Sequence, residues 1–447
     1  MRTLFIIFVF AWGSIFAQTD LNNPTSVKYF SKLDPASIVE KINHNNINNL
    51  DTKYSESIKY NKGDDDVVVF WHKLALSIAA DFNRPVKSKD GLTYPVATRE
   101  NPYQYPKFPY SSPPYTARML AYLSVLMYDT HQFINEHSIK IGIASNQKNM
   151  ESSLNFAAAH LLTYFYPCAA ENIENVLVRR IAQQENYDKK TNSIGIIIAN
   201  EILEIAKNDN FENNKSLVLA QYKYPSESNF EAWKSLDIPN RPPLLPKFGL
   251  VKTWHLNDKN IGSVTPQPPP SIGSDQFMTA LTELKNYSKS LTKDQTAIAN
   301  FWADGPGSPT PPGHWNTIAL DLMESEKIGF LKKLEILAYL NTAMMDAAVC
   351  CWQTKYYYAY PRPNQIDPSI QTILGVPNFP SYTSGHSTFS GAAATILAHY
   401  FPKQKKSLNK MAINASESRI YGCIHYRFDC EAGLECGIKI GKIALKN

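Results

Sequence analysis

The sequence predicts an all-α protein. Three observations favour this fold class: most long apolar segments repeat with the period of a helix, strand-like alternation is scarce, and proline-rich stretches separate the apolar segments. The helical period predicts helices over 67–82, 115–136, 151–166, 192–207, 331–354, 386–401 and 431–446. Because proline stops a helix, we expect connections over 101–114, 241–247, 266–270 and 306–313.

The first 17 residues have the pattern of a cleaved secretory signal, with one early arginine, an apolar run and a small residue before Gln18. A membrane anchor is the alternative, but the run is short for a helix that spans a bilayer. No later segment looks apolar for long enough, so we expect a secreted or periplasmic protein without a membrane span. Residues 20–60 are rich in Asn and Lys and could be a free arm or a docking segment.

The composition excludes some partners and leaves others open. The net charge is only +5 over 447 residues, and no stripe of Lys and Arg alternates with aromatic residues, so we expect no nucleic-acid partner. The six cysteines could be free thiols or form disulfides, with Cys423, Cys430 and Cys436 the closest in sequence. No C-x-x-C pair suggests a zinc cluster. The sequence does not set the oligomeric state.

The two halves of the chain contain a faint repeat. LAYLSVLMYD (120–129) aligns with LAYLNTAMMD (337–346), with six of ten positions identical. Two further pairs follow in the same order: NFAAAHLLTYFYP (155–167) with SGAAATILAHYFP (390–402), and SIGIIIANEILEIA (193–206) with EAGLECGIKIGKIA (431–444). The spacing between the copies grows from 217 to 235 to 238 residues, as insertions in loops would produce. Chance similarity of Ala- and Leu-rich helices is the alternative.

The repeat predicts two related four-helix bundles packed into one helical unit. We expect a signal over 1–17, a first bundle over 18–240 and a second bundle over 241–447. Only the second should carry a chemical site, because Glu151 stands where the repeat would place His386.

Three polar clusters in the second half suggest a cage for a tetrahedral oxyanion. Such an anion needs donors from several directions, and Lys, Arg, a Ser hydroxyl and a Gly N–H supply them. Of two histidines, one could bond to the central atom of the anion while the other transfers protons. The clusters are Lys355 with Arg362-Pro363, then Ser384-Gly385-His386, then Arg419, His425 and Asp429.

Local structure could bring these side chains together. A helix that breaks before Pro361 lets Lys355 and Arg362 point at one anion, although two surface cations are the alternative. Ser384 should begin a helix whose free N–H groups attract an anion, or it could simply be an N-cap.

Arg419 and His425 lie six residues apart, so one continuous helix would not place them on one face. Gly422 suggests that the helix ends or bends between them. Asp429, or a backbone carbonyl, could then fix the tautomer of His425. The alternative is a structural histidine.

The clusters resemble the signature shared by type 2 phosphatidic acid phosphatases and vanadium-dependent haloperoxidases: K-x6-R-P (Lys355 to Pro363), S-G-H (Ser384 to His386) and S-R-x5-H-x3-D (Ser418 to Asp429). The resemblance implies vanadate as cofactor, with His425 as the vanadium ligand, or as the phosphorylated nucleophile of a phosphatase. It implies His386 as the acid–base residue, and Lys355 as the group that polarises bound peroxide. The residues that it implies for the equatorial oxygens are Lys355, Arg362, Ser384, Gly385 and Arg419.

The cage alone does not choose between the two families, but the first bundle favours the haloperoxidases, which are built from two four-helix bundles. Trp352 and Phe379 match aromatic positions of their halide pocket. Algal bromoperoxidases carry histidine where Phe379 stands, and the bacterial iodoperoxidases are the branch that the chain most resembles. We therefore expect hydrogen peroxide and iodide, with bromide next, as substrates.

The product would be a hypohalous acid that reacts with small organic acceptors. Two alternatives remain: a secreted acid phosphatase with a phosphohistidine intermediate, and a helical binding protein without catalysis. His314 and Trp315 could line the entrance of the site or belong to the core.

Overall fold

The computed structural model describes residues 29–31, 33–44, 66–84, 112–212, 232–236 and 243–446. The expected signal and the expected domain boundary at residue 240 lie outside these residues. Within them there is no strand, which confirms the all-α class. The helices are α1 (Pro35–His44), α2 (Val67–Phe82), α3 (Pro113–His137), α4 (Gln147–Phe165), α5 (Ala170–Ile181), α6 (Lys190–Lys207), α8 (Ile261–Val264), α9 (Asp275–Lys289), α10 (Lys293–Phe301), α11 (Thr310–Ser325), α12 (Phe330–Tyr358), α13 (Pro363–Ile366), α14 (Gly385–Tyr400), α15 (Lys405–Tyr421) and α16 (Arg427–Ala444), with 3-10 turns η1 (Pro167–Ala169), η2 (Phe248–Leu250) and η3 (Pro402–Gln404).

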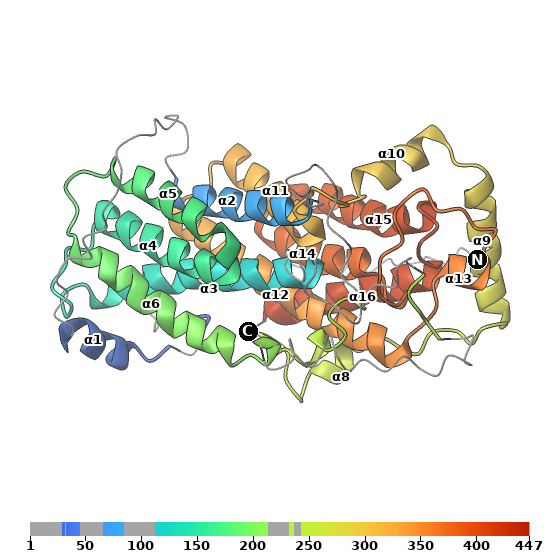
Figure 1. The fold of residues 1–447 in the computed structure, drawn as a ribbon, viewed down its shortest axis with the longest axis horizontal. Helices are drawn as coiled ribbons and strands as arrows, with labels where there is room; N and C mark the ends of the chain where they lie inside the picture. Colours follow the sequence, from blue (N-terminus) through green and yellow to red (C-terminus); the bar gives the residue numbers. More distant parts are fainter. Residues whose placement is uncertain are drawn as a thin grey trace, which may run out of the picture.

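Two groups of four helices form an elongated molecule (Figure 1). Helices α3, α4, α5 and α6 pack on one another in the first half, and α12, α14, α15 and α16 do so in the second. Helix α3 lies against α12, which joins the two groups through a continuous apolar core. The order of elements is the same in both groups, including the 3-10 turn after α4 and after α14. The predicted pair of related four-helix bundles is therefore present.

The repeat extends one helix further than its sequence showed. Trp71 on α2 donates its indole N–H to Asn155 on α4, and Trp315 on α11 donates to Ser390 on α14. Asn155 and Ser390 are themselves equivalent positions of the repeat. Helices α2 and α11 are thus a further repeated pair, and Trp315 belongs to the core.

An internal two-fold relation places equivalent residues face to face where α3 crosses α12. Asn341 Nδ2 donates to Ser124 Oγ over 2.8 Å, and these residues are equivalents in the first repeated segment. The buried aspartates that end that segment also behave alike. Asp129 accepts the backbone N–H groups of residues 30 and 31, and Asp346 accepts those of residues 254 and 255. Each bundle therefore ties down its own incoming chain with one carboxylate.

Several helices were not expected from the sequence, namely α5, α9, α10, α11 and α15. Helix α15 is mostly polar and buries small residues such as Ala412 and Ala415, so its apolar period is weak. The proline-rich stretch 306–313 was wrongly given as a connection throughout, because α11 already begins at Thr310. Pro311 and Pro312 occupy its first turn. Backbone N–H groups there have no partner within the helix, so the N–H that proline lacks is not missed.

Two further expectations need correction or completion. Residues Phe330–Ile366 are long and apolar enough to cross a bilayer by composition, contrary to the expectation for the segments after residue 17. However, 89% of that apolar window is buried inside the protein, as in the core helix of a soluble protein.

All six cysteines are free thiols, and only Cys168 is exposed. The described part of segment 20–60 includes α1, which docks on α6.

Candidate active site

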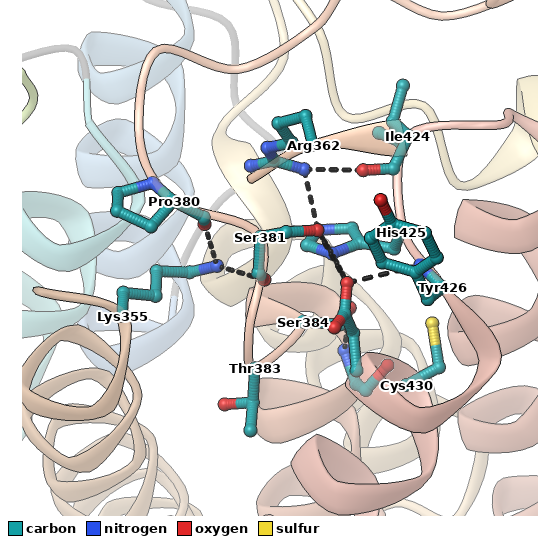
Figure 2. A network of polar contacts seen from close by, with 12 residues as sticks. Lys355, Arg362, Pro380, Ser381, Thr383, Ser384, Ile424, His425, Tyr426 and Cys430 are labelled. Atoms are coloured by element: carbon teal, nitrogen blue, oxygen red, sulfur yellow. Dashed lines mark hydrogen bonds and ion pairs between the residues drawn. The ribbon is translucent and has the colours of Figure 1, made fainter. Parts of the chain in front are cut away.

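The end of α12 directs two cations of the predicted cage toward each other. The helix stops at Tyr358, and Ala359 adopts a left-handed conformation (φ 45°) that turns the chain before Pro361. Lys355, in the last turn, donates its ammonium to the carbonyls of Pro380 (2.8 Å) and Ser381 (2.9 Å), as Figure 2 shows. Arg362 follows the turn and is fully buried beside the same loop. The predicted break in the helix thus brings the two cations to one site.

Ser384 caps the N-terminus of α14, as expected. Its hydroxyl oxygen accepts the N–H of Ser387, and its one proton can be donated to Cys430 or, in place of that bond, to an anion. Its backbone N–H donates to Asp429 O over 3.0 Å. Gly433 of α16 allows this approach, since a Cβ there would lie 2.7 Å from Ser384 O. The cap role and the anion-binding role of Ser384 are therefore compatible.

The loop after α15 turns His425 back toward Arg362. Helix α15 ends at Tyr421 with Gly422 as its cap, and Cys423 takes the positive φ of 56° that reverses the chain. A Cβ on Gly422 would lie 2.6 Å from Leu374, which explains the glycine. The predicted end of the helix between Arg419 and His425 is confirmed.

Hydrogen bonds assign the tautomer of His425. Its Nε2 lies 3.0 Å from Arg362 Nη1, which can only donate, so Nε2 carries a lone pair. Its Nδ1 lies 3.0 Å from Asp429 Oδ2 and therefore donates. Ser381 donates to the same carboxylate oxygen over 2.5 Å. Asp429 and Ser381 together hold the ring so that a basic nitrogen faces the guanidinium of Arg362.

The electrostatics of the site call for an anion. Burial lowers the pKa of Lys355, and it lowers the pKa of both Arg362 and Arg419 to about 10. Burial, together with Arg362 and Lys355, places the pKa of His425 well below its ordinary value, so the ring is neutral at neutral pH. Burial also raises the pKa of Asp429. Three desolvated cations thus converge near two carboxylates, Asp429 and Asp304, and a bound anion would favour their charged forms further.

Among the residues predicted for the cage, His386 is the one whose side chain is partly exposed to solvent. Its side chain is 17% exposed, and Nε2 lies 3.3 Å from Asp304 Oδ2 with poor hydrogen-bond alignment. The other oxygen of Asp304 bonds to His314 Nδ1 over 2.9 Å. Burial and the nearby Arg419 lower the pKa of His386 to about 4, although Asp304 acts in the opposite direction. His314 therefore lies beside the site, joined to His386 through Asp304.

The two aromatic residues predicted for a halide pocket lie together beside the cage. The rings of Trp352 and Phe379 are 5.1 Å apart, and Lys355 Nζ lies 4.9 Å from the centre of the Phe379 ring. A Cβ added to Gly385 would approach Trp352 at 3.7 Å, so the aromatic wall borders the start of α14. Arg362 also stacks near Phe379, at 5.1 Å.

The residues present fit an oxyanion such as vanadate. Arg362 Nη2 is fully buried and has no hydrogen-bond partner, as a donor kept for an anion would. By contrast, the described parts of the chain contain no cluster of three His, Cys, Asp or Glu side chains suited to a metal cation. The arrangement is built from donors, with the lone pair of His425 Nε2 as the one ligand for a central atom.

Comparisons with known proteins agree with this geometry. Residues 335–446 match the PAP2 superfamily. The structure is similar to that described as the first bacterial vanadium-dependent iodoperoxidase, with a TM-score of 0.68 and 22% identity over 88% of this chain and 98% of that one. The fold is that of the vanadium-dependent haloperoxidases. This confirms the resemblance seen in the sequence.

Two structures of bacterial vanadium-dependent chloroperoxidase show the same fold at lower similarity. The apo form has a TM-score of 0.56 and 13% identity over 75% of this chain and 93% of that one. The holo form has a TM-score of 0.55 and 13% identity over 86% and 91% of the two chains. No curated protein is significantly similar in sequence.

The structure also shows site residues that sequence reasoning missed. Ser381 and Asp304 contact the two histidines, and Trp302 accepts Arg419 Nη2 through its carbonyl. Ser381 stands only three residues before Ser384, so its position was a usable signal. Asp304 lies about eighty residues away in a loop between helices, and its role depends on packing that no local pattern reveals.

Proposed function

We propose that the protein is a vanadate-dependent haloperoxidase that oxidises halide with hydrogen peroxide to hypohalous acid. The observation that carries the proposal is the neutral His425, whose Nε2 lone pair faces buried cations while Asp429 holds Nδ1. Similarity along 98% of an iodoperoxidase chain supports the oxidative reaction over hydrolysis. The overall reaction consumes one halide, one peroxide and one proton, and gives hypohalous acid and water.

Each part of the cage has a separate task in this proposal. Bound vanadate would supply Lewis-acid activation of peroxide toward two-electron oxidation of a halide. His425 would bind the central atom, while Lys355, Arg362 and Arg419 would neutralise the oxygens. His386 is neutral at neutral pH, so it can accept a proton from hydrogen peroxide and return it to the departing water.

The aromatic wall suggests which halide is used. Trp352 and Phe379 give the site an apolar, polarisable side next to Lys355. A large, weakly hydrated halide loses least on entering such a site, which favours iodide, with bromide next. We further propose export to the periplasm or outside the cell, on the pattern of residues 1–17. Small organic molecules would then accept the oxidised halogen.

Phosphate-ester hydrolysis is the second candidate, because the matched PAP2 superfamily also includes phosphatases. Phosphate and vanadate are both tetrahedral oxyanions, and the lone pair of His425 Nε2 could attack phosphorus as readily as it binds vanadium. The same His386 would then protonate the leaving alcohol in its protonated form, which a pKa of about 4 makes abundant only in acidic solution.

One experiment separates the two reactions. Purified protein is loaded with orthovanadate and assayed with iodide and hydrogen peroxide, beside a generic phosphomonoester without vanadate. We expect vanadate to switch on iodide oxidation, and His425→Ala to abolish it. Phosphate release that vanadate inhibits, with no halide oxidation, would instead establish the phosphatase.

A further inference from the structure

The loop between α10 and α11 carries a carboxylate that faces the acid–base histidine. Asp304 contacts both His386 Nε2 (3.3 Å) and His314 Nδ1 (2.9 Å). Burial alone would raise the pKa of Asp304, but its bonds to the two histidines hold it below the ordinary value, so it is ionised at neutral pH. Its position decides which nitrogen of His386 carries the proton.

This loop is poorly suited to hold Asp304 by itself. Asp304 takes a left-handed backbone conformation (φ 44°), which is unfavourable for a residue with a side chain. Gly305 and Gly307 follow it, and glycine loses more conformational freedom on ordering than any other residue. One internal turn, from Ser308 N to Gly305 O, closes the loop but does not attach it to the rest of the protein. Asp304 itself bonds to His314, but the backbone of residues 305–308 needs a further contact from outside the loop.

That contact comes from the bundle that has no chemical site. Asn83 ends α2, and its side chain donates to Gly305 O (2.9 Å) and Ser308 O (3.1 Å). Its own carbonyl accepts Gly307 N–H over 2.9 Å. A Cβ added to Gly307 would lie 3.4 Å from the side chain of Arg84, which therefore packs beside this glycine. Three hydrogen bonds from one residue therefore clamp the loop on both sides of its tip.

A simple helix cap would not need this arrangement. Asn208 occupies the same cap position at the end of α6, and its side chain bonds to Glu204 O of its own helix. The backbone N–H of Asn83 donates to carbonyls of its own helix α2, whereas its side chain reaches across to the second bundle. The contrast indicates a task for Asn83 beyond ending α2.

We propose that Asn83 is a positioning residue for the reaction, which acts on His386 by holding the loop that carries Asp304. The first bundle would thus complete the active site without contributing a residue that touches substrate. The effect on turnover depends on the proposed haloperoxidase function, whereas the clamp on the loop does not.

Two measurements on the full-length protein test the clamp. The variants are Asn83→Ala, which removes both side-chain donors, and Asn83→Asp, which places an oxygen against two carbonyls. Asn208→Ala is the matched control, because it removes a cap of the same type far from the loop. Hydrogen–deuterium exchange of the peptide covering residues 302–310 is measured without vanadate. Initial rates of iodide oxidation are measured after vanadate loading.

We expect faster exchange in that peptide for both Asn83 variants, largest for Asn83→Asp, and unchanged exchange for Asn208→Ala. We also expect kcat to fall by about tenfold while the KM for iodide stays within about twofold, because misplacing a proton-transfer group affects the chemical step. Unchanged exchange in the Asn83 variants, or equal losses in Asn208→Ala, would overturn the proposal. Exchange that changes as expected in a protein without any halide oxidation would refute the proposed function and leave the clamp intact.

Discussion

The buried cations are the residues on which the chemistry of the site depends most. Arg419 donates through Nε to Ser418 and through Nη2 to Trp302 O, so its guanidinium is held rigid before any anion arrives. Rigid donors lose little freedom on binding, which favours tight capture of a tetrahedral oxyanion. The low dielectric around them strengthens the same attraction.

Replacing Arg419 by Ala should weaken vanadate binding by about 30- to 100-fold, because one charge-assisted donor is lost from a buried site. Equilibrium dialysis against vanadate measures the dissociation constant. Arg427→Ala is the control, since the side chain of Arg427 is partly exposed and pairs with Glu283 although it stands between His425 and Asp429 in the sequence. Equal affinities for wild type and Arg419→Ala would mean that the anion binds elsewhere.

At this scale the sequence predicted the residues that belong to a spaced motif and missed those that do not. Lys355, Arg362 and Arg419 were predicted because they fall in K-x6-R-P and S-R-x5-H-x3-D, on either side of Ser384-Gly385-His386. Ser381 was not, because a single serine in a loop has many possible roles. Its place next to Asp429 follows from the path of the 379–384 loop over α16, which depends on tertiary packing.

The repeated helices allow one copy to predict the behaviour of the other. His72 on α2 bonds through Nδ1 to Val68 O, four residues earlier, and Asn316 on α11 bonds to Pro312 O in the same way. Both residues follow the repeated tryptophan directly. The same place in the fold is thus filled by an ionisable side chain in one bundle and a neutral one in the other.

His72→Asn should therefore remove an acid-sensitive group and keep its backbone contact. Burial lowers the pKa of His72 from 6.5 to about 4. Between these two pH values the histidine is protonated in the unfolded chain and neutral in the folded protein. The stability that His72 contributes is full above pH 6.5 and falls as the pH drops toward 4, by about 3 kcal/mol.

Urea unfolding at pH 7.5 and pH 4.5 measures this difference. We expect a smaller loss of stability at pH 4.5 for His72→Asn than for wild type. His160→Asn is the control, because His160 lies near the surface of α4 and bonds to Asn200. An acid sensitivity that is equal in His72→Asn and wild type would show that another group is responsible.

Helices with a wide apolar face were predicted well, and helices that bury mainly small or polar side chains were not. Helix α2 was predicted over its full range, 67–82, and α12 to within a few residues. Helix α15 was missed because most of its buried residues are alanine, serine and Arg419, and its large apolar residues Leu408, Ile420 and Tyr421 lie at its two ends, so no apolar period results. Helix α10 is short and buries only Ala299, and α9 buries four apolar residues at the same end of the molecule (Figure 1).

Across the whole molecule, the repeated aspartates join distant parts of the chain. Asp129 and Asp346 have the same place at the ends of the repeated segments, and each accepts two backbone N–H groups of an extended stretch. The aromatic residues of these stretches cross between the halves: Phe30 packs on Tyr339, and Trp254 packs on Tyr122. Each bundle therefore holds a stretch of chain that also contacts the other.

Asp346→Asn should destabilise the protein by about 1–3 kcal/mol. In the wild type both carboxylate oxygens accept a backbone N–H, whereas in the variant the side-chain NH2 group would face one of these N–H groups and leave it without an acceptor. Asp129→Asn should cost a similar amount, for the same reason. The free energy of urea unfolding at pH 7.5 is the measurement, with Asp321→Asn on the exposed face of α11 as control. Unchanged stability in both buried variants would contradict the role assigned to these carboxylates.

The contact between Ser124 and Asn341 has an evolutionary consequence. In an ancestor formed by two identical chains, the residue on the axis would meet a copy of itself, and any change there would appear twice at once. Fusion of two such chains into one polypeptide would remove that restriction, and here a donor on one side meets an acceptor on the other. The loss of identity at this point would have permitted one half to specialise in chemistry while the other kept the scaffold.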